Sequence, residues 1–187
     1  MEVDCTLCFR QARRVVVKVG SGVLTGRDGL NTEIIKSISR QICRLSGDKL
    51  EVLLVSSGAM ASGQKKIGLS RRPEEIPKRQ AIAAVGQAGL ILCYENAFAE
   101  FNRHVAQILL TSDDLSSSRR RYLNARNTLH TLLAWNVVPV INENDTVVVE
   151  EIKFGDNDNL SAHIALMMNA DILINLTDIN GLYTGDP

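Results

Sequence analysis

Short apolar runs that alternate with amphipathic helical segments are the feature that most constrains the fold of this chain. The first run, Val15–Val19, is mostly β-branched and enters a glycine-containing turn, and a helical pattern follows from Asn31 or Thr32 to Gly47. A second run, Val52–Val55, leads into Ser-Ser-Gly and an alanine-rich stretch. Strands that are apolar throughout, rather than at every second residue, are typical of parallel sheets buried on both faces. The pattern therefore predicts an α/β fold, a three-layer α/β/α sandwich with a mainly parallel sheet.

The same alternation continues along the rest of the chain. Further strands are expected at 105–110, 137–141 and 172–176, a β-rich stretch at 146–152, and helices at 78–101, 119–135 and 159–169. The segment 177–187 follows a strand directly and has no helix to cover it. We therefore expect a polar tail at 1–14 and one domain at 15–187 that looks truncated at its C-terminus.

Composition excludes several classes of protein. Lys plus Arg and Asp plus Glu number 21 each, so the zero net charge argues against a nucleic-acid partner bound through a basic surface. No apolar run approaches the ~20 residues that a membrane-spanning helix needs, and the acidic N-terminus lacks the pattern of a secretory signal. Cys5 and Cys8 form a C-x-x-C motif, but no second pair completes a zinc site. We expect a cytoplasmic protein with no membrane partner.

Small, polar or charged residues follow the expected strands, whose carboxyl ends meet at one edge of a parallel sheet. Lys18 comes just before Gly20 and Gly22, where backbone amides and a lysine charge suit a bound phosphate. A tight turn beside a lysine that extends to solvent explains the same residues equally well. The Ser-Ser-Gly segment at 56–58 also has two explanations. It is either an anion site at the N-terminus of the following helix or an ordinary N-cap of that helix.

Two clusters of Asn and Asp follow, at 142–146 and 155–159. Such residues are common in turns for local backbone reasons. Yet Asp145, Asp156 and Asp158 would crowd like charges, so we expect a cation among them: an ammonium group, a lysine or a hydrated Mg²⁺. The glycine patterns of dinucleotide-binding and P-loop proteins are absent.

These motifs together resemble the amino-acid kinase family, most closely its members that phosphorylate the side-chain carboxylate of glutamate. The resemblance rests on VVVKVGSGVL at 15–24, VLLVSSGAMASG at 52–63, AVGQAGL at 84–90, LNARNTL at 123–129, VVPVINENDT at 137–146, KFGDNDNLSA at 153–162 and LTDINGLYTGDP at 176–187. It implies an α/β sandwich that binds the amino acid in one half and ATP with Mg²⁺ in the other. The implied reaction is transfer of the γ-phosphoryl group of ATP to glutamate, the first step of proline biosynthesis. Residues 15–187 would then hold the substrate-binding part and the start of the nucleotide-binding part.

The resemblance also implies a role for individual residues. The catalytic pair would be Lys18, which supports the transferring phosphoryl group, and Asp158, which organises the catalytic lysines. The substrate-binding residues would be Ser57, Gly58, Asn142, Asp145 and Asn157. The nucleotide-binding residues would be Lys18, Gly20, Ser21, Thr177 and Asp178, and no protein ligand to a metal is implied.

Further family traits are expectations of the same kind. They are glutamate as the substrate, proline as a feedback inhibitor and assembly into a homo-oligomer. Two alternatives to the phosphorylation of glutamate stay open. One is a catalytically silent amino-acid-binding fragment. The other is a different member of the family, such as an acetylglutamate or uridylate kinase.

Overall fold

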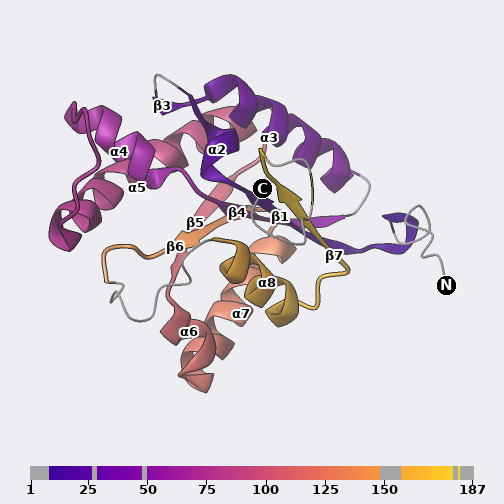
Figure 1. The fold of residues 1–187 in the computed structure, drawn as a ribbon. Helices are drawn as coiled ribbons and strands as arrows, with labels where there is room; N and C mark the ends of the chain where they lie inside the picture. Colours follow the sequence, from indigo (N-terminus) through magenta and orange to yellow (C-terminus); the bar gives the residue numbers. More distant parts are fainter. Residues whose placement is uncertain (1–8, 27–28, 48–49, 148–156, 179–180, 182–187) are drawn as a thin grey trace.

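The computed structural model describes residues 9–26, 29–47, 50–147, 157–178 and 181. Its centre is a five-stranded sheet in the order β5-β6-β4-β1-β7 (Figure 1). The strands are β1 (Arg14–Val19), β4 (Glu51–Ser56), β5 (Val105–Leu110), β6 (Val138–Glu143) and β7 (Ile172–Leu176). Each described pairing in this sheet is parallel, which confirms the expected α/β fold with a mainly parallel sheet.

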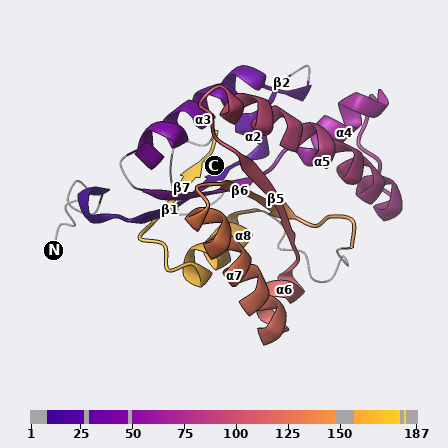
Figure 2. The same ribbon diagram turned by 180° about the vertical axis from the view of Figure 1, so that it is seen from behind.

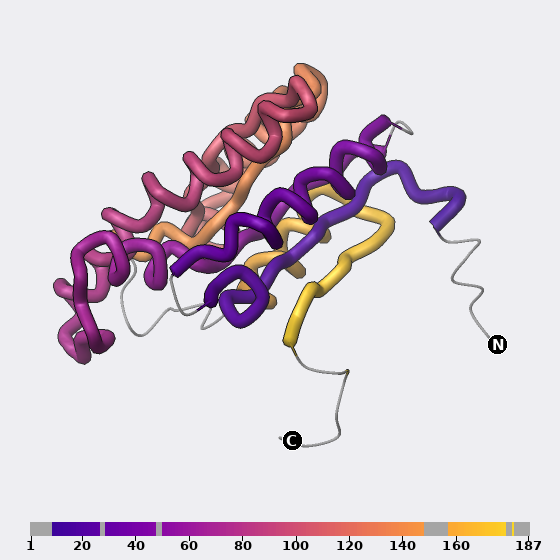
Figure 3. Tube along the Cα trace, turned by 90° about the horizontal axis from the view of Figure 1, so that it is seen from above, coloured from indigo at the N-terminus to yellow at the C-terminus, as the bar shows by residue number. Residues whose placement is uncertain are grey.

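Helices cover both faces of the sheet and complete the expected three layers. They are α3 (Thr32–Gly47), α4 (Ala59–Ile67), α5 (Ile76–Ala99), α6 (Ser112–Ser116), α7 (Arg119–Ala134) and α8 (Asn157–Met167). Figures 1 and 2 show α3 and α5 above the sheet and α6, α7 and α8 below it. Seen from above, α3 and α5 run side by side over the sheet (Figure 3).

The side chains of β1 alternate between the two helical layers. Val15, Val17 and Val19 are buried in the core that α3 and α5 form. Val16 is buried in the opposite core with Leu160 of α8. Each such side chain stabilises the fold by ~1.5–3 kcal/mol when it leaves water. Because successive strand residues face opposite sides, this alternation puts Lys18 on the α8 side of the sheet.

Most expected elements are found within two residues of their predicted ends, and the differences are local. The sequence did not predict α2 (Ser21–Leu24) or the antiparallel hairpin of β2 (Thr25–Gly26) and β3 (Gly29–Leu30). These elements follow the first glycine turn, where glycines hide both helical and strand periodicity. Residues 148–152 of the expected β-rich stretch, residues 182–187, Cys5 and Cys8 lie outside the described residues.

One described helix, α5, is long and apolar enough to cross a membrane by length and composition alone. Its best 18-residue window has a mean hydropathy of 1.2, and 44% of that window is buried inside the protein. The expectation that no segment approaches this length is therefore corrected. Core helices of soluble proteins pass the same test, and α5 packs against α3 and α4, so this is only a weak indication of a membrane span.

Candidate active site

The carboxyl ends of β1, β4 and β6 bring distant motifs together at one edge of the sheet. In the register of the sheet, Lys18 lies opposite Val55, and Val19 lies opposite Ser56, the residue before Ser57. β6 pairs with β4 on its other side and ends at Glu143. The N-terminus of α8 carries Asn157 and Asp158 to the same edge. Parallel pairing thus assembles the site from segments far apart in the chain.

Lys18 and Asp158 form an ion pair at this edge, with Nζ and Oδ1 2.5 Å apart. The lysine side chain is 6% exposed, whereas the aspartate side chain is 48% exposed. A buried ammonium group needs a charged or polar partner, because leaving water disfavours the charged form. Asp158 is such a partner, so one of the three aspartates expected beside a cation lies beside Lys18.

Asn157 links two further strand ends through its side-chain amide. Its Nδ2 donates to Ser57 Oγ at 2.7 Å and to Asn142 Oδ1 at 3.0 Å. The same Asn142 oxygen accepts the backbone N–H of Glu143 at 2.9 Å. Asn142 and Asn157 are both buried, so these bonds fix their orientation. Three of the predicted substrate-binding residues therefore form one connected network.

A cavity of about 380 Å³ opens beside this network. Its lining comprises Ser21, Thr25, Ser57, Gly58, Ala59, Met60, Ala61, Gln64, Arg72, Asn142, Glu143, Asp145 and Asn157. All five predicted substrate-binding residues are in this lining, and so is Ser21. The volume lies within the range of small-molecule sites, and the polar side chains suit a small charged ligand.

The turn between β4 and α4 is held in place by a hydrogen bond from α5. Gly58 has φ +103°, a left-handed conformation that glycine adopts without strain. Tyr94 of α5 is fully buried, and its hydroxyl lies 2.9 Å from Ser56 Oγ, which in turn donates to the Ser57 carbonyl. Burial raises the pKa of Tyr94 well above its usual value, so its hydroxyl stays protonated. This bond positions Ser57 at the cavity wall.

The predicted nucleotide-binding residues lie at the ends of β1 and β7 and, except for Ser21, outside this cavity. The backbone N–H of Gly20 donates to the Leu176 carbonyl at 3.1 Å. Thr177 and Asp178 are exposed, and Thr177 lines a separate hollow of about 550 Å³ between α3 and β7. A Cβ at Gly22 would lie 2.4 Å from Asp178 Oδ2, so this glycine leaves room for that carboxylate. Asp156 lies outside the described residues.

Glu143 of the lining falls within the predicted cluster at 142–146, but sequence reasoning missed three other polar residues: Thr25, Gln64 and Arg72. Thr25 lies in the unpredicted hairpin, and Gln64 lies on α4 beyond the Ser-Ser-Gly turn. Arg72 lies in the connection between α4 and α5. None of these three residues follows one of the predicted strands. The expectation that polar residues gather where parallel strands end therefore does not apply to them.

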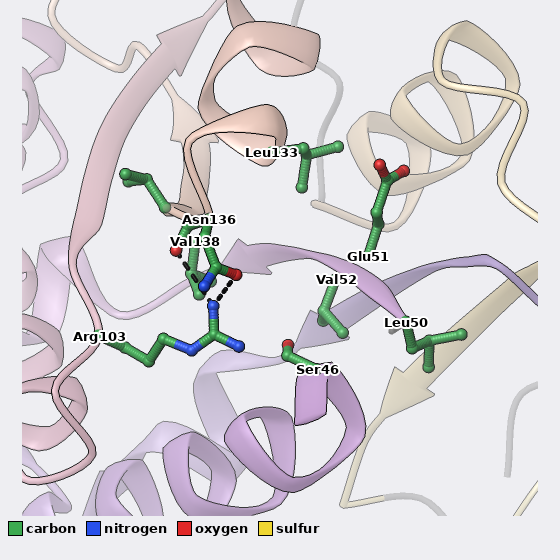
Figure 4. A pocket seen from close by; sticks show the side chains of 9 residues that line it. Ser46, Leu50, Glu51, Val52, Arg103, Leu133, Asn136 and Val138 are labelled. Carbon is green, nitrogen blue, oxygen red and sulfur yellow. Dashed lines mark hydrogen bonds between the residues drawn. The ribbon is translucent and has the colours of Figure 1, made fainter. Parts of the chain in front are cut away.

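A second, smaller cavity lies at the opposite edge of the sheet, where β4 and β6 begin (Figure 4). It measures about 120 Å³ and is lined by residues that include Glu51, Arg103 and Val138. Arg103 donates to the Asn136 carbonyl at 3.2 Å and to the side-chain oxygen of Asn136, and these bonds fix one wall of the cavity. None of the predicted site residues is in this lining.

The described residues contain no cluster of three His, Cys, Asp or Glu side chains suited to a metal ion. Mg²⁺ commonly binds through phosphate oxygens and water with only one or two carboxylates. One or two carboxylates of this kind suit an Mg²⁺ ion that takes its other ligands from phosphate oxygens and water. Asp158 and Asp178 are the exposed carboxylates among the predicted site residues near the end of β1.

Comparison with known proteins agrees with this arrangement. Residues 13–187 match the amino acid kinase family. The chain is 58% identical over 177 residues to glutamate 5-kinase of Syntrophotalea carbinolica, covering 95% of this chain and 47% of that protein. It is 54% identical over 176 residues to glutamate 5-kinase of Thermus thermophilus, covering 94% of this chain and 47% of that protein.

The chain therefore spans about half the length of the curated relatives it matches. Among solved structures, UMP kinase from Ureaplasma parvum aligns with a TM-score of 0.60 over 93% of this chain and 73% of that chain. At 18% identity this likeness shows the fold alone. With a family match that covers nearly the whole sequence, the chain belongs to the amino acid kinase family.

Proposed function

We propose that this chain provides the glutamate-binding part of a kinase that phosphorylates the side-chain carboxylate of glutamate, the first step of proline biosynthesis. The observation that carries the proposal is the cavity in which Ser57, Asn142, Asp145 and Asn157 meet beside the Lys18–Asp158 pair. The relatives named glutamate 5-kinase, at 53–58% identity, support the choice of substrate.

The lining divides into groups that suit the two ends of glutamate. Asp145 is an anionic partner for the ammonium group of the substrate. The Ser57 hydroxyl accepts from Asn157 Nδ2, which orients it and leaves its own proton to donate to a carboxylate of the substrate. The side-chain carboxylate has an ordinary pKa of about 4.3 and is ionised near pH 7. It is therefore a nucleophile that needs no general base.

Lys18 is the residue that we assign to the transfer step. An anionic carboxylate must approach an anionic phosphate, so positive charge has to be in place before the groups meet. ATP with Mg²⁺ supplies the phosphoryl group and part of that charge when bound. The Lys18 ammonium supplies the remainder, and Asp158 keeps its Nζ at the edge of the sheet. Gly20, Ser21, Thr177 and Asp178 are the candidate nucleotide contacts.

Three further expectations belong to the same proposal. They are inhibition by proline, homo-oligomeric assembly and a cytoplasmic location. We also propose that residues 15–187 hold the substrate-binding part and the start of the nucleotide-binding part. The relatives are about twice as long, which leaves room for the rest of a nucleotide-binding part in a longer chain. Calorimetry with proline and light scattering of the purified chain test the first two directly.

The decisive experiment traps the acyl phosphate. The chain is incubated with glutamate, MgATP and hydroxylamine, and the hydroxamate is measured; the Thermus thermophilus relative serves as the positive control. Acetylglutamate and UMP replace glutamate in parallel reactions that record ADP release. Hydroxamate from glutamate supports the proposal, whereas turnover with another acceptor alone contradicts it. Glutamate binding by calorimetry with no hydroxamate assigns the chain a binding role instead.

A further inference from the structure

We infer that Arg72 binds the α-carboxylate of glutamate and makes the site select for that group, an inference that rests on the proposed function. Arg72 lies in the connection between α4 and α5 and lines the 380 Å³ cavity.

Among the charged residues of the cavity lining, Arg72 is the partner that the α-carboxylate of glutamate requires. Glutamate carries an ammonium group and two carboxylates, and the side-chain carboxylate is the one that must reach the transfer site near Lys18. The charged residues in the described lining are Arg72, Glu143 and Asp145. The two acidic residues suit the ammonium group and repel a carboxylate. Arg72 is thus the one cation in the described lining that the α-carboxylate can meet.

The position of Arg72 beyond the last turn of α4 agrees with this assignment. Along α4 the cavity lining runs from Ala59, the first residue of the helix, to Gln64. At 1.5 Å per residue this stretch is about 8 Å long. Gln64 Nε2 donates to the Leu69 carbonyl at 3.2 Å and so ties the helix to the connection that carries Arg72. In Figure 1 this connection lies at the outer end of α4, away from the end of β1 that carries Lys18.

Arg72 is also available for a ligand. Its side chain is exposed, and within the described part of the chain it has no hydrogen bond or ion pair. A guanidinium group matches a carboxylate through two parallel N–H donors, which adds geometric selectivity to charge. Glutamate bound in this way would be held at both ends, with the reacting carboxylate toward Lys18.

A comparison of two ligands separates this contact from a general effect on the cavity. 4-Aminobutanoate keeps the ammonium group and the reacting carboxylate of glutamate but lacks the α-carboxylate. Binding of each ligand to the 187-residue chain is measured by NMR titration for the wild type, Arg72→Gln and Arg71→Gln. Arg71 is a matched control, because it is exposed, adjacent and absent from the described lining. Dispersed spectra confirm that each variant is folded.

We expect Arg72→Gln to weaken glutamate binding about tenfold, to leave 4-aminobutanoate binding within twofold of the wild type, and Arg71→Gln to change neither. Unchanged glutamate affinity in Arg72→Gln overturns the inference while the glutamate site stands. Equal losses for both ligands, or the same loss in Arg71→Gln, overturn it as well. A wild-type chain that binds no glutamate contradicts the proposed function itself and the inference with it.

Discussion

The Nζ of Lys18 lies 2.5 Å from Oδ1 of Asp158, although the lysine side chain is almost fully buried and the aspartate is about half exposed. The two partners therefore depend on each other unequally. Water can solvate the carboxylate when the lysine is removed, but it reaches the ammonium group far less well when the aspartate is removed.

We therefore predict that Asp158→Asn lowers the free energy of unfolding by ~1–3 kcal/mol, whereas Lys18→Met changes it by less than ~1 kcal/mol. The Met side chain fills the apolar space of the lysine stem and leaves no buried charge. Urea unfolding of both variants measures the difference. In the hydroxamate assay, Lys18→Met should lower the rate ~100- to 1000-fold. Equal losses of stability, or an unchanged rate in Lys18→Met, would contradict this account.

Asn157→Asp should disrupt the network at the cavity wall. The substitution replaces the amide donor with an anion that faces the oxygens of Ser57 and Asn142, each within 3.0 Å of Nδ2. We expect a loss of ~1–3 kcal/mol in the free energy of unfolding and at least tenfold weaker glutamate binding. Asn159→Asp is the matched control, since Asn159 is exposed two residues further along α8. A glutamate affinity equal to that of the wild type would remove Asn157 from the site.

Asp145→Asn should weaken glutamate binding about 10- to 100-fold, because the ammonium group of glutamate then meets a neutral amide oxygen instead of a carboxylate. Glutarate, which lacks the ammonium group, should bind the variant no more weakly than the wild type. Calorimetry with both ligands checks this, with Asp113→Asn as an exposed control outside the described lining. If both ligands lose affinity equally, Asp145 shapes the cavity rather than binding the ammonium group.

The crossing of α4 and α5 leaves no room for a side chain at Gly63 or Gly86. A Cβ at Gly86 would lie 1.7 Å from the Ala59 carbonyl oxygen, and one at Gly63 would lie 1.8 Å from that of Ile82. Gly86→Ala must therefore separate the helices, and we expect it to cost ~3 kcal/mol or more in unfolding free energy. Gly47→Ala is the control, because no atom lies within 4 Å of a Cβ there. Similar thermal unfolding of the two variants would show that the helices cross less closely.

Asp171 should make the stability of the protein depend on pH in the acid range. The backbone N–H groups of Arg13 and Arg14 donate to its carboxylate and hold its pKa below the ordinary 3.8. A lowered pKa in the folded state stabilises the protein above pH 3.8, and this contribution is lost as the pH falls through the folded-state value. Asp171→Asn should lower the free energy of unfolding by ~1 kcal/mol or less at pH 7, since the group is exposed. It should have no effect at a pH below both the folded-state and the unfolded-state pKa of Asp171.

Chemical denaturation at pH 7 and at pH 2.5 tests this dependence. Glu74→Gln is the control, because Glu74 is exposed and has no hydrogen bond or ion pair in the described part of the chain. A difference between the wild type and Asp171→Asn that is as large at the acid pH as at neutral pH would contradict the assignment.

Several parts of the site were visible in the sequence for a physical reason. Lys18 stood out because a charged residue interrupts a run of valines that a parallel sheet must bury. Ser57, Asn142 and Asn157 could be grouped because they follow strands or begin a helix at the same edge of such a sheet. Their hydrogen bonds confirm that grouping.

Other parts could not be found in this way. Tyr94 looks like an ordinary apolar residue of α5, and only the packing of that helix on the sheet brings its hydroxyl to Ser56. Arg72 is one of two adjacent arginines in a connection, and no periodicity distinguishes the one that lines the cavity. The hairpin that supplies Thr25 is too short to give a pattern. These residues depend on tertiary contacts that local sequence does not encode.

The hydrogen bond between Asn157 and Ser57 joins residues that are 100 positions apart. Such a contact has a high loop-closure cost and forms only when most of the chain has found its native topology. Occupancy of the cavity is consequently coupled to the global folding equilibrium. A ligand at a hundred times its dissociation constant would shift that equilibrium by ~2.7 kcal/mol, so the melting temperature of the chain reports ligand occupancy without any enzymatic readout.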